Sequence, residues 1–359
     1  MNYRITGFDL ARSYAIFGML IVNFSFSFGS FSGTSPLAKF QFLFIGNATS
    51  IFIILAGIGV SLMTHRNDYS ELDKKKIKKT ILKRSWFLFG LGLLLYSWWP
   101  GDILHFYGGY LHVAAFILFL SKHYYLKGAL ISLIIYHILL LIIPVETGWN
   151  YTTTEYVDFW TPTGFLRNTL YNGWNSIFPW ISFFLFGMWL GKLDWNNKIV
   201  KRRLFIVALI VFLLFKGLKI AASYALFDAS VNSYMLIEYS PIVIPFIMIT
   251  ASCAIFALLI SLYVANKFHT YKIIQYLITT GKMSLTMYVF HLTVGMIILS
   301  KISGQPYTGF YAVGKTASPL YIMIYVLTFY TISVFLCVLW SKYFKKGPIE
   351  ILMRKFSND

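Results

Sequence analysis

The sequence predicts an all-α integral membrane protein: a polytopic bundle of about ten transmembrane helices around a polar cavity, with both termini in the cytoplasm. Of its 359 residues, 58% are hydrophobic and only 12% are charged, and the mean hydropathy is +0.67. Soluble domains are about 25% charged. The apolar residues form repeated stretches, and polar insertions between them are short. We therefore treat residues 1–359 as a single membrane domain.

Each apolar stretch is long enough for a helix that crosses or enters a bilayer, where backbone groups must find partners within their own segment. The stretches are residues 8–28, 40–64, 84–99, 105–121, 128–143, 177–191, 204–225, 240–264, 283–300 and 318–340. Only five residues, 100–104, separate the third from the fourth. This spacing predicts a tight hairpin.

The basic residues set the orientation. With a cytoplasmic N-terminus, 25 of the 31 Lys and Arg residues fall on the inner side and four on the outer side, as the positive-inside rule requires. The net charge of +18 is then a property of one face, and it suits lipid head groups or a polyanionic cytoplasmic ligand. Nucleic-acid binding is not expected, because no soluble module carries the charge.

Both cysteines lie in apolar stretches, so no disulfide or metal site is predicted.

The first stretch, FDLARSYAIFGMLIVNFSFSF, carries Asp9, Arg12 and Asn23. An ionisable group costs roughly 2.5–3.5 kcal/mol at the centre of a membrane helix. Asp9 and Arg12 are three residues apart, so they share a helix face and can pair. This pattern favours a helix that faces a polar cavity over one that faces lipid.

The hairpin sequence GDILHFYGGYLHV places Asp102 three residues before His105. A helix that begins near Gly101 brings the two onto one face, and a carboxylate beside an imidazole raises its basicity and fixes its tautomer. This interpretation makes His105 a general base. In the alternative, Asp102 caps the helix and His105 lies at the membrane interface.

The sequence GKMSLTMYVFHLTVG contains Ser284, Tyr288 and His291 at helical spacings of four and three. His291 falls near the middle of its stretch, where a polar side chain is expected to face the bundle interior. It is a second candidate base, with a packed, hydrogen-bonded histidine as the alternative.

The outer segment 144–175 is rich in Trp and Tyr. This indicates an aromatic belt at the membrane interface or a platform on which a carbohydrate stacks.

Several pieces of the chain together resemble the bacterial YeiB-like family (domain of unknown function 418) and the catalytic domain of heparan-alpha-glucosaminide N-acetyltransferase. They are FDLARSYAIFGMLIVNF, IFIILAGIGVSLM, GDILHFYG, FPWISFFLFGMWLGKL, GKMSLTMYVFH and the closing FKKGPIEILMR. The resemblance implies a transmembrane acyltransferase in a bacterial cytoplasmic membrane. Such enzymes pass an acyl group, here expected to be acetyl, from cytoplasmic acyl-CoA to an extracytoplasmic hydroxyl or amine of a glycan or small molecule. Membrane lipids are further partners, and a homo-oligomer is compatible with the sequence.

One position departs from a related pattern. Membrane O-acyltransferases of the acyltransferase-three group carry Arg, ten residues and then His in the first span; here Arg12 is followed by Asn23, which cannot act as a base. We therefore expect His105, oriented by Asp102, to be the base, and His291 to be the second choice.

The remaining site residues follow from the same resemblance. Arg12, with Asp9, is expected to hold the CoA phosphates at the inner side. Asn23, Ser284 and Tyr288 are expected to line the transfer path. The alternative function is a transporter or flippase that uses the same polar cavity without chemistry.

Overall fold

The computed structural model describes residues 4–29, 35–64, 68–307, 309 and 316–358 as a nearly all-α bundle. The long helices are α1 (Thr6–Phe28), α3 (Asn47–Leu62), α4 (Glu71–Tyr96), α6 (Lys122–Ile142), α9 (Lys198–Ser223), α11 (Ile244–Lys267) and α15 (Pro319–Ser341). The shorter ones are α2 (Pro36–Phe42), α5 (Leu104–Ile117), α7 (Pro162–Arg167), α8 (Ile177–Leu190), α10 (Ala229–Leu236), α12 (Lys272–Gly281), α13 (Ser284–Phe290), α14 (Met296–Ser303) and α16 (Pro348–Ser357).

Two π-helical turns and one small hairpin complete the described elements. The π turns are η1 (Asn168–Asn172) and η2 (His291–Gly295). Strands β1 (Trp149–Asn150) and β2 (Glu155–Tyr156) pair antiparallel. Segment 144–175 therefore contains regular secondary structure. A π turn inside a helix often marks a functional site, and η2 begins at His291.

Seven helical segments among the described residues are long and apolar enough to cross a membrane. They are Thr6–Phe28, Pro36–Leu62, Lys122–Ile142, Lys198–Ser223, Ile244–Lys267, Ser284–Ser303 and Pro319–Ser341. These apolar helices fit an integral membrane protein. The predicted stretch 40–64 contains the end of α2 and all of α3. Gly46, with a φ of 72°, is the N-cap of α3.

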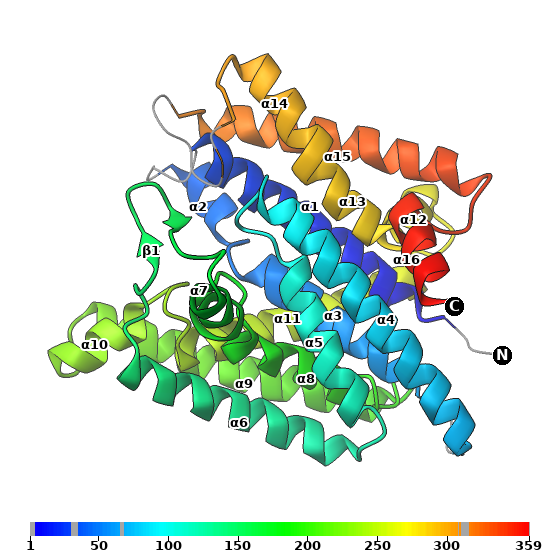
Figure 1. Ribbon diagram of the computed structural model, residues 1–359, viewed down its shortest axis with the longest axis horizontal. Helices are drawn as coiled ribbons and strands as arrows, with labels where there is room; N and C mark the ends of the chain where they lie inside the picture. The colour runs from blue at the N-terminus through cyan, green and yellow to red at the C-terminus, as the bar shows by residue number, and fades with distance from the viewer. Residues whose placement is uncertain (1–3, 30–34, 65–67, 308, 310–315, 359) are drawn as a thin grey trace.

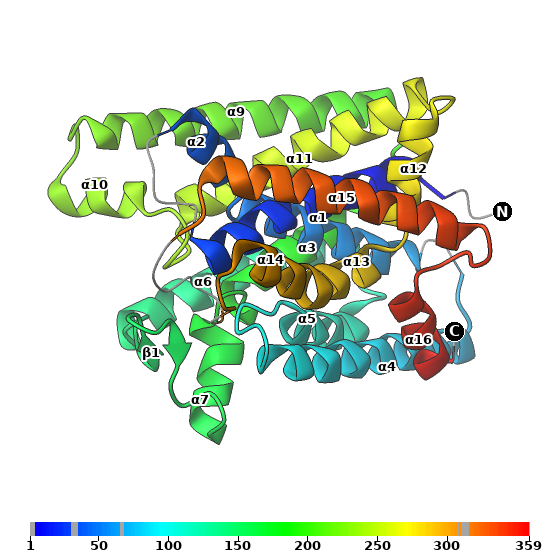
Figure 2. The ribbon, with the colours of Figure 1, turned by 90° about the horizontal axis from the view of Figure 1, so that it is seen from above.

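Helix α1 runs through the centre of the bundle, with α9 on one side and α4 on the other (Figure 2). It packs against α3, α11, α12 and α15, and most of its side chains are buried. Helix α9 buries few side chains. In both ribbon views α10 and β1 lie at one end of the bundle and α16 lies at the other (Figures 1 and 2).

The predicted hairpin is present as α4 and α5, which pack closely along each other. Helix α4 is longer than the apolar stretch 84–99, because a capping box between Ser70 and Asp73 starts it within the charged segment. Helix α5 starts at Leu104, three residues later than the predicted start near Gly101.

Helices α3 and α8 cross at backbone contact. A Cβ atom added to Gly57 would lie 2.0 Å from the carbonyl oxygen of Phe184, and one added to Gly187 would lie 2.2 Å from that of Ile54. Only glycine permits such an approach, which is a common way for membrane helices to associate.

Candidate active site

The paired charges of α1 lie at the end of the bundle that also holds α16. Asp9 is 1% exposed, and its carboxylate accepts hydrogen bonds from Arg4 Nε at 2.7 Å and Arg12 Nη1 at 2.8 Å. The predicted pairing of Asp9 with Arg12 is confirmed. Arg12 Nη2 lies 3.4 Å from the carbonyl oxygen of Leu55. The guanidinium is therefore held between α1 and α3, with its side chain 23% exposed.

Asp102 and His105 form a fully buried pair at the start of α5. Asp102 Oδ2 accepts hydrogen bonds from the His105 backbone N–H at 3.0 Å and from His105 Nδ1 at 3.1 Å. The carboxylate therefore binds the first turn of α5 and also orients the imidazole, and His105 is buried within the bundle. The rings of Tyr96 and Phe106 pack against the imidazole, and His105 Nε2 has no hydrogen-bond partner among the described residues.

Gly92 on α4 makes room for this pair. A Cβ atom there would lie 2.1 Å from the His105 backbone nitrogen and 2.6 Å from Asp102 Oδ2. The Asp102–His105 pair can occupy this position because glycine, which has no side chain, stands at position 92 of α4.

Tyr288 on α13 joins the dyad from the opposite side. Its hydroxyl accepts the Ile103 backbone N–H at 3.1 Å and donates to Asp102 Oδ1 at 3.3 Å. Asp102 therefore lies between the imidazole of His105 and the phenol of Tyr288. A buried network in which each member is bonded has a defined geometry.

His291 contacts Asn23 directly. Asn23 Nδ2 donates to His291 Nε2 at 2.9 Å, and His291 Nδ1 faces the carbonyl oxygen of Met287 at 3.2 Å. A carbonyl only accepts, so Nδ1 carries the proton and Nε2 keeps its lone pair. The side chain of His291 is fully buried. His291 Nε2 thus contacts Asn23, the position at which the acyltransferase-three pattern has a histidine.

A small, partly open cavity lies beside these residues. Its lining includes Asn23, Ile103 and Tyr288, together with Asn175, Trp174 and Tyr239. His291 lies behind Asn23, and Asp102 behind Tyr288. Two of the predicted path residues thus line the cavity and two histidines stand behind them.

The other predicted site residues lie elsewhere. Ser284 is the first residue of α13, one turn before Tyr288, and is not among the residues that line the cavity. Arg12 lies about three turns, and Asp9 about four turns, before Asn23 on α1. Among the residues that the structure describes, no group of three or more His, Cys, Asp and Glu side chains could hold a metal ion.

Comparison with known families assigns the chain. The sequence profile described as "Heparan-alpha-glucosaminide N-acetyltransferase, catalytic" matches residues 4–227, well over half of the chain. The chain belongs to this family. The profile "Protein of unknown function (DUF418)" matches residues 187–358. No curated protein and no solved structure matches the chain significantly.

Membership in the heparan-alpha-glucosaminide N-acetyltransferase family places the protein among membrane acetyltransferases. The two matched regions overlap at residues 187–227 and divide the site between them. Asn23, Asp102 and His105 fall in the first, and Tyr288 and His291 in the second. The cavity wall is therefore built from both regions.

Sequence reasoning missed several cavity residues of this acetyltransferase. The Asn175 side-chain oxygen is buried without a partner among the described residues, although Asn175 lines the cavity. Trp174 and Tyr239 come from segments far apart in the chain, and the Tyr239 hydroxyl donates to the Trp174 carbonyl at 3.2 Å. The only sequence signal was the aromatic content of segment 144–175.

Glu350 of α16 caps the helix that carries Tyr288 and His291. Its Oε1 accepts the backbone N–H groups of Leu285 at 2.8 Å and Thr286 at 3.2 Å, and its Oε2 accepts the Thr286 hydroxyl at 2.5 Å. Burial raises the pKa of the Glu350 carboxyl above its usual value, opposed by the hydrogen bonds from Thr286 and Leu285. A carboxylate at a helix N-terminus is favourable.

Replacing Glu350 with alanine is expected to destabilise the protein by about 0.5–2 kcal/mol, the usual cost of a lost N-cap, and to lower acetyl transfer, because α13 loses the group that fixes its first turn. The measurement is thermal unfolding of the purified protein together with transfer rate. Glu71→Ala is the matched control, since its ion pair with Lys74 is exposed. Equal effects of the two substitutions would contradict a role for the cap.

Proposed function

We propose that the protein transfers an acetyl group from cytoplasmic acetyl-CoA to an extracytoplasmic hydroxyl or amine of a glycan or small molecule. Family membership supports acetyl transfer. The single observation that carries the site assignment is the contact between Asn23 and His291 at the cavity wall. It supplies an unprotonated imidazole nitrogen where α1 itself has none.

In the proposed reaction His291 is the general base. The acceptor hydroxyl or amine displaces the Asn23 amide from His291 Nε2 and attacks the thioester carbonyl carbon, while its proton moves to Nε2. The Asn23 amide is then free to donate to the oxyanion. When the carbon–sulfur bond breaks, the CoA thiolate leaves and takes the proton from Nε2. The atoms balance without a metal or an acylated residue.

The Asp102–His105 pair takes a positioning role in this proposal. Neither histidine lines the cavity, but His291 hydrogen-bonds the lining residue Asn23 directly. His105 reaches the lining residue Tyr288 only through Asp102. This geometry favours His291 over His105 as the base, the reverse of the order expected from the sequence. Asp102 holds the Tyr288 hydroxyl at the cavity wall, and His105 holds Asp102. The Tyr288 hydroxyl is then placed to hydrogen-bond the acceptor.

The proposed topology has ten crossings with both termini in the cytoplasm. The start of α1 and α16 lie at the same end of the bundle (Figure 1), which requires an even number of crossings. The seven long segments become ten with α4, α5 and α8. This arrangement also keeps 25 basic residues on the inner side, as expected in a bacterial cytoplasmic membrane.

The donor end is proposed at this inner side. The Arg12 side chain is 23% exposed beside Asp9, and its guanidinium would contact a CoA phosphate. Lys192, just beyond α8, donates to the carbonyl and hydroxyl of Thr64 at 2.6 and 2.8 Å. Burial lowers its pKa below the usual value.

The test is transfer of label from [¹⁴C]acetyl-CoA by the purified protein in liposomes, with a panel of sugars on the extracytoplasmic side. We expect saturable, time-dependent acetylation of at least one sugar. Sugar flux into the liposomes without any CoA, and no acetylated product in its presence, would instead identify a transporter and overturn the proposal.

A further inference from the structure

The π turn η2 begins at His291 and changes the hydrogen-bond pattern of the backbone there. In an α-helix the Met296 N–H would donate to the carbonyl of Leu292, four residues earlier. Here it donates to the carbonyls of His291 and Thr293 instead. The π turn therefore removes the usual donor from the carbonyl of Leu292, a residue that is fully buried.

The indole of Trp98 supplies a replacement donor. Its Nε1–H donates to the Leu292 carbonyl oxygen at 2.7 Å, although 194 residues separate the two in sequence. Trp98 lies in the connection between α4 and α5, residues 97–103. A buried carbonyl without a donor is unfavourable. The indole N–H therefore stabilises the π turn at the residue that follows His291.

Tyr307 holds the indole in this orientation. Its ring stacks on that of Trp98 with centroids 4.5 Å apart, and its hydroxyl donates to the Trp98 carbonyl at 2.6 Å. Trp98 is 37% exposed, so burial alone does not fix its side chain. The two contacts with Tyr307 keep the indole N–H directed at Leu292.

The same connection contacts α13 at a second point. The Ile103 N–H donates to the Tyr288 hydroxyl at 3.1 Å, and Tyr288 is four residues before Leu292. The two contacts are thus about one helical turn apart, and His291 lies between them in sequence. Residues 97–103 therefore hold both ends of the helical turn that carries the proposed base.

Helix α15 fixes the other end of η2. The Tyr325 hydroxyl donates at 2.7 Å to the carbonyl of Gly295, the last residue of the π turn. A π turn contains one residue more than an α turn, so its loss would rotate the helix on one side relative to the other by about 100°. The contact of His291 with Asn23 and the contact at Gly295 could not then both persist.

We propose that Trp98 is a positioning residue for acetyl transfer. Its indole N–H stabilises the π form of η2, and the π form keeps the imidazole of His291 against Asn23. Trp98 is not among the residues that line the cavity, so it acts through Leu292 and not on the acceptor. This inference rests on the proposed function, in which His291 is the base.

The test is Trp98→Phe, because phenylalanine keeps an aromatic ring beside Tyr307 but has no N–H. The turnover rate is expected to fall about ten-fold, the equivalent of one hydrogen bond, with KM for acetyl-CoA unchanged. In a His291→Gln background the same substitution is expected to have little further effect on the rate, because its target is already absent. A merely structural role would lower the rate by the same factor in both backgrounds.

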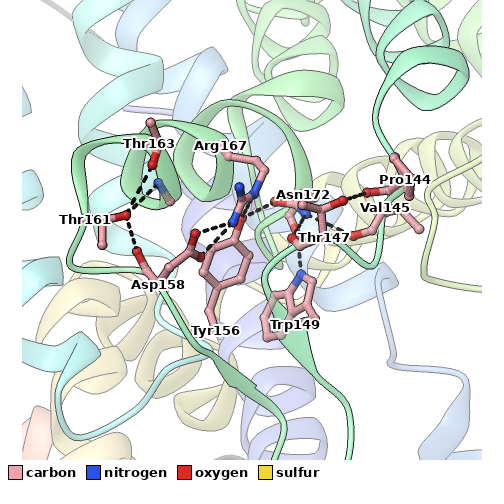
Figure 3. A network of polar contacts seen from close by, with 11 residues as sticks. Pro144, Val145, Thr147, Trp149, Tyr156, Asp158, Thr161, Thr163, Arg167 and Asn172 are labelled. Atoms are coloured by element: carbon pink, nitrogen blue, oxygen red, sulfur yellow. Dashed lines mark hydrogen bonds and ion pairs between the residues drawn. The ribbon is translucent and has the colours of Figure 1, made fainter.

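Trp149→Phe is the matched control. The Trp149 indole N–H donates to the carbonyl of Asn172 at 2.8 Å (Figure 3), and Asn172 is the last residue of the other π turn, η1. The substitution removes the same kind of bond from a turn that carries no proposed base. Any rate loss that it causes is expected to be the same with and without His291.

A readout that does not require turnover is the ¹⁵N spectrum of the imidazole nitrogens in histidine-labelled protein. The signals of His291 are those that disappear in His291→Gln. The structure predicts a proton on its Nδ1 and a hydrogen bond accepted by its Nε2. Trp98→Phe is expected to shift or broaden these signals, and Trp149→Phe to leave them unchanged.

Equal rate losses from Trp98→Phe in the two backgrounds, or unchanged His291 signals, would overturn the positioning role. The two proposals can fail separately. Altered His291 signals in Trp98→Phe, in a protein that transfers no acetyl group, would retain the link between the two residues and reject the transferase. Acetyl transfer with unchanged His291 signals would retain the transferase and reject the role of Trp98.

Discussion

Replacing His291 with glutamine is expected to lower the rate of acetyl transfer by roughly 10²- to 10⁴-fold, the contribution typical of a general base. Glutamine can still hydrogen-bond Asn23, but it has no basic nitrogen. Acetyl-CoA binding is expected to persist, since the proposed donor contacts lie on α1 about three turns away. The measurement is the turnover rate of purified protein beside a direct acetyl-CoA binding assay.

Two further variants make this experiment decisive. His137→Gln is the matched control, because His137 bonds only Leu133 and Tyr234, away from the cavity; its rate is expected to be unchanged. The double variant Asn23→His with His291→Asn exchanges the two members of the contact, and it is expected to recover part of the lost activity. Full activity of His291→Gln, with activity lost in His105→Gln, would assign the base to His105.

Replacing Gly92 with alanine is expected to reduce both stability and transfer. The added Cβ would meet the His105 backbone nitrogen at 2.1 Å and Asp102 Oδ2 at 2.6 Å, so α4 and α5 must separate. Overpacking of this kind costs about 1–3 kcal/mol. Displacement of Asp102 also releases the Tyr288 hydroxyl from the cavity wall. Thermal unfolding and the full kinetics for the acceptor check the two effects.

Gly90→Ala is the control for this substitution. Gly90 lies two residues away on the same helix, and nothing stands within 4 Å of the position its Cβ would take. Alanine also has the higher helix propensity, so this variant is expected to be at least as stable as the original. A transfer rate that falls equally in both variants would show that the dyad does not depend on this close approach.

The sequence predicted the parts of the site that depend on neighbouring residues. Asp9 with Arg12 and Asp102 with His105 are each three residues apart, and the geometry of one helical turn is enough to bring each pair together. The α4–α5 hairpin was predicted from the chain length between the two helices, because the five residues 100–104 allow only a tight turn. Family membership also followed from motifs that the sequence shows directly.

Contacts between distant segments could not be predicted in this way. Asn23 and His291 are separated by 268 residues, and no periodic pattern links them. The absence of a histidine at position 23 and the candidate His291 were both visible in the sequence, but the contact between Asn23 and His291 was not. The wall shared by Trp174 and Tyr239 likewise depends on how α8 and α11 enter the bundle. The charged N-terminal part of α4 begins at the capping box of Ser70 and Asp73. It was not part of the predicted stretch 84–99, because its residues are polar.

The cap that Glu350 gives to α13 has a consequence for biosynthesis. During translation the N-terminal part of a chain folds first, so α13 and its histidine enter the membrane before α16 leaves the ribosome. Helix α13 therefore gains the capping hydrogen bonds from Glu350 only after residue 350 has been synthesised. Unfinished copies are expected to insert but to remain inactive. For the same reason a bulky fusion joined directly to α16 is expected to impair turnover more than one placed in a loop.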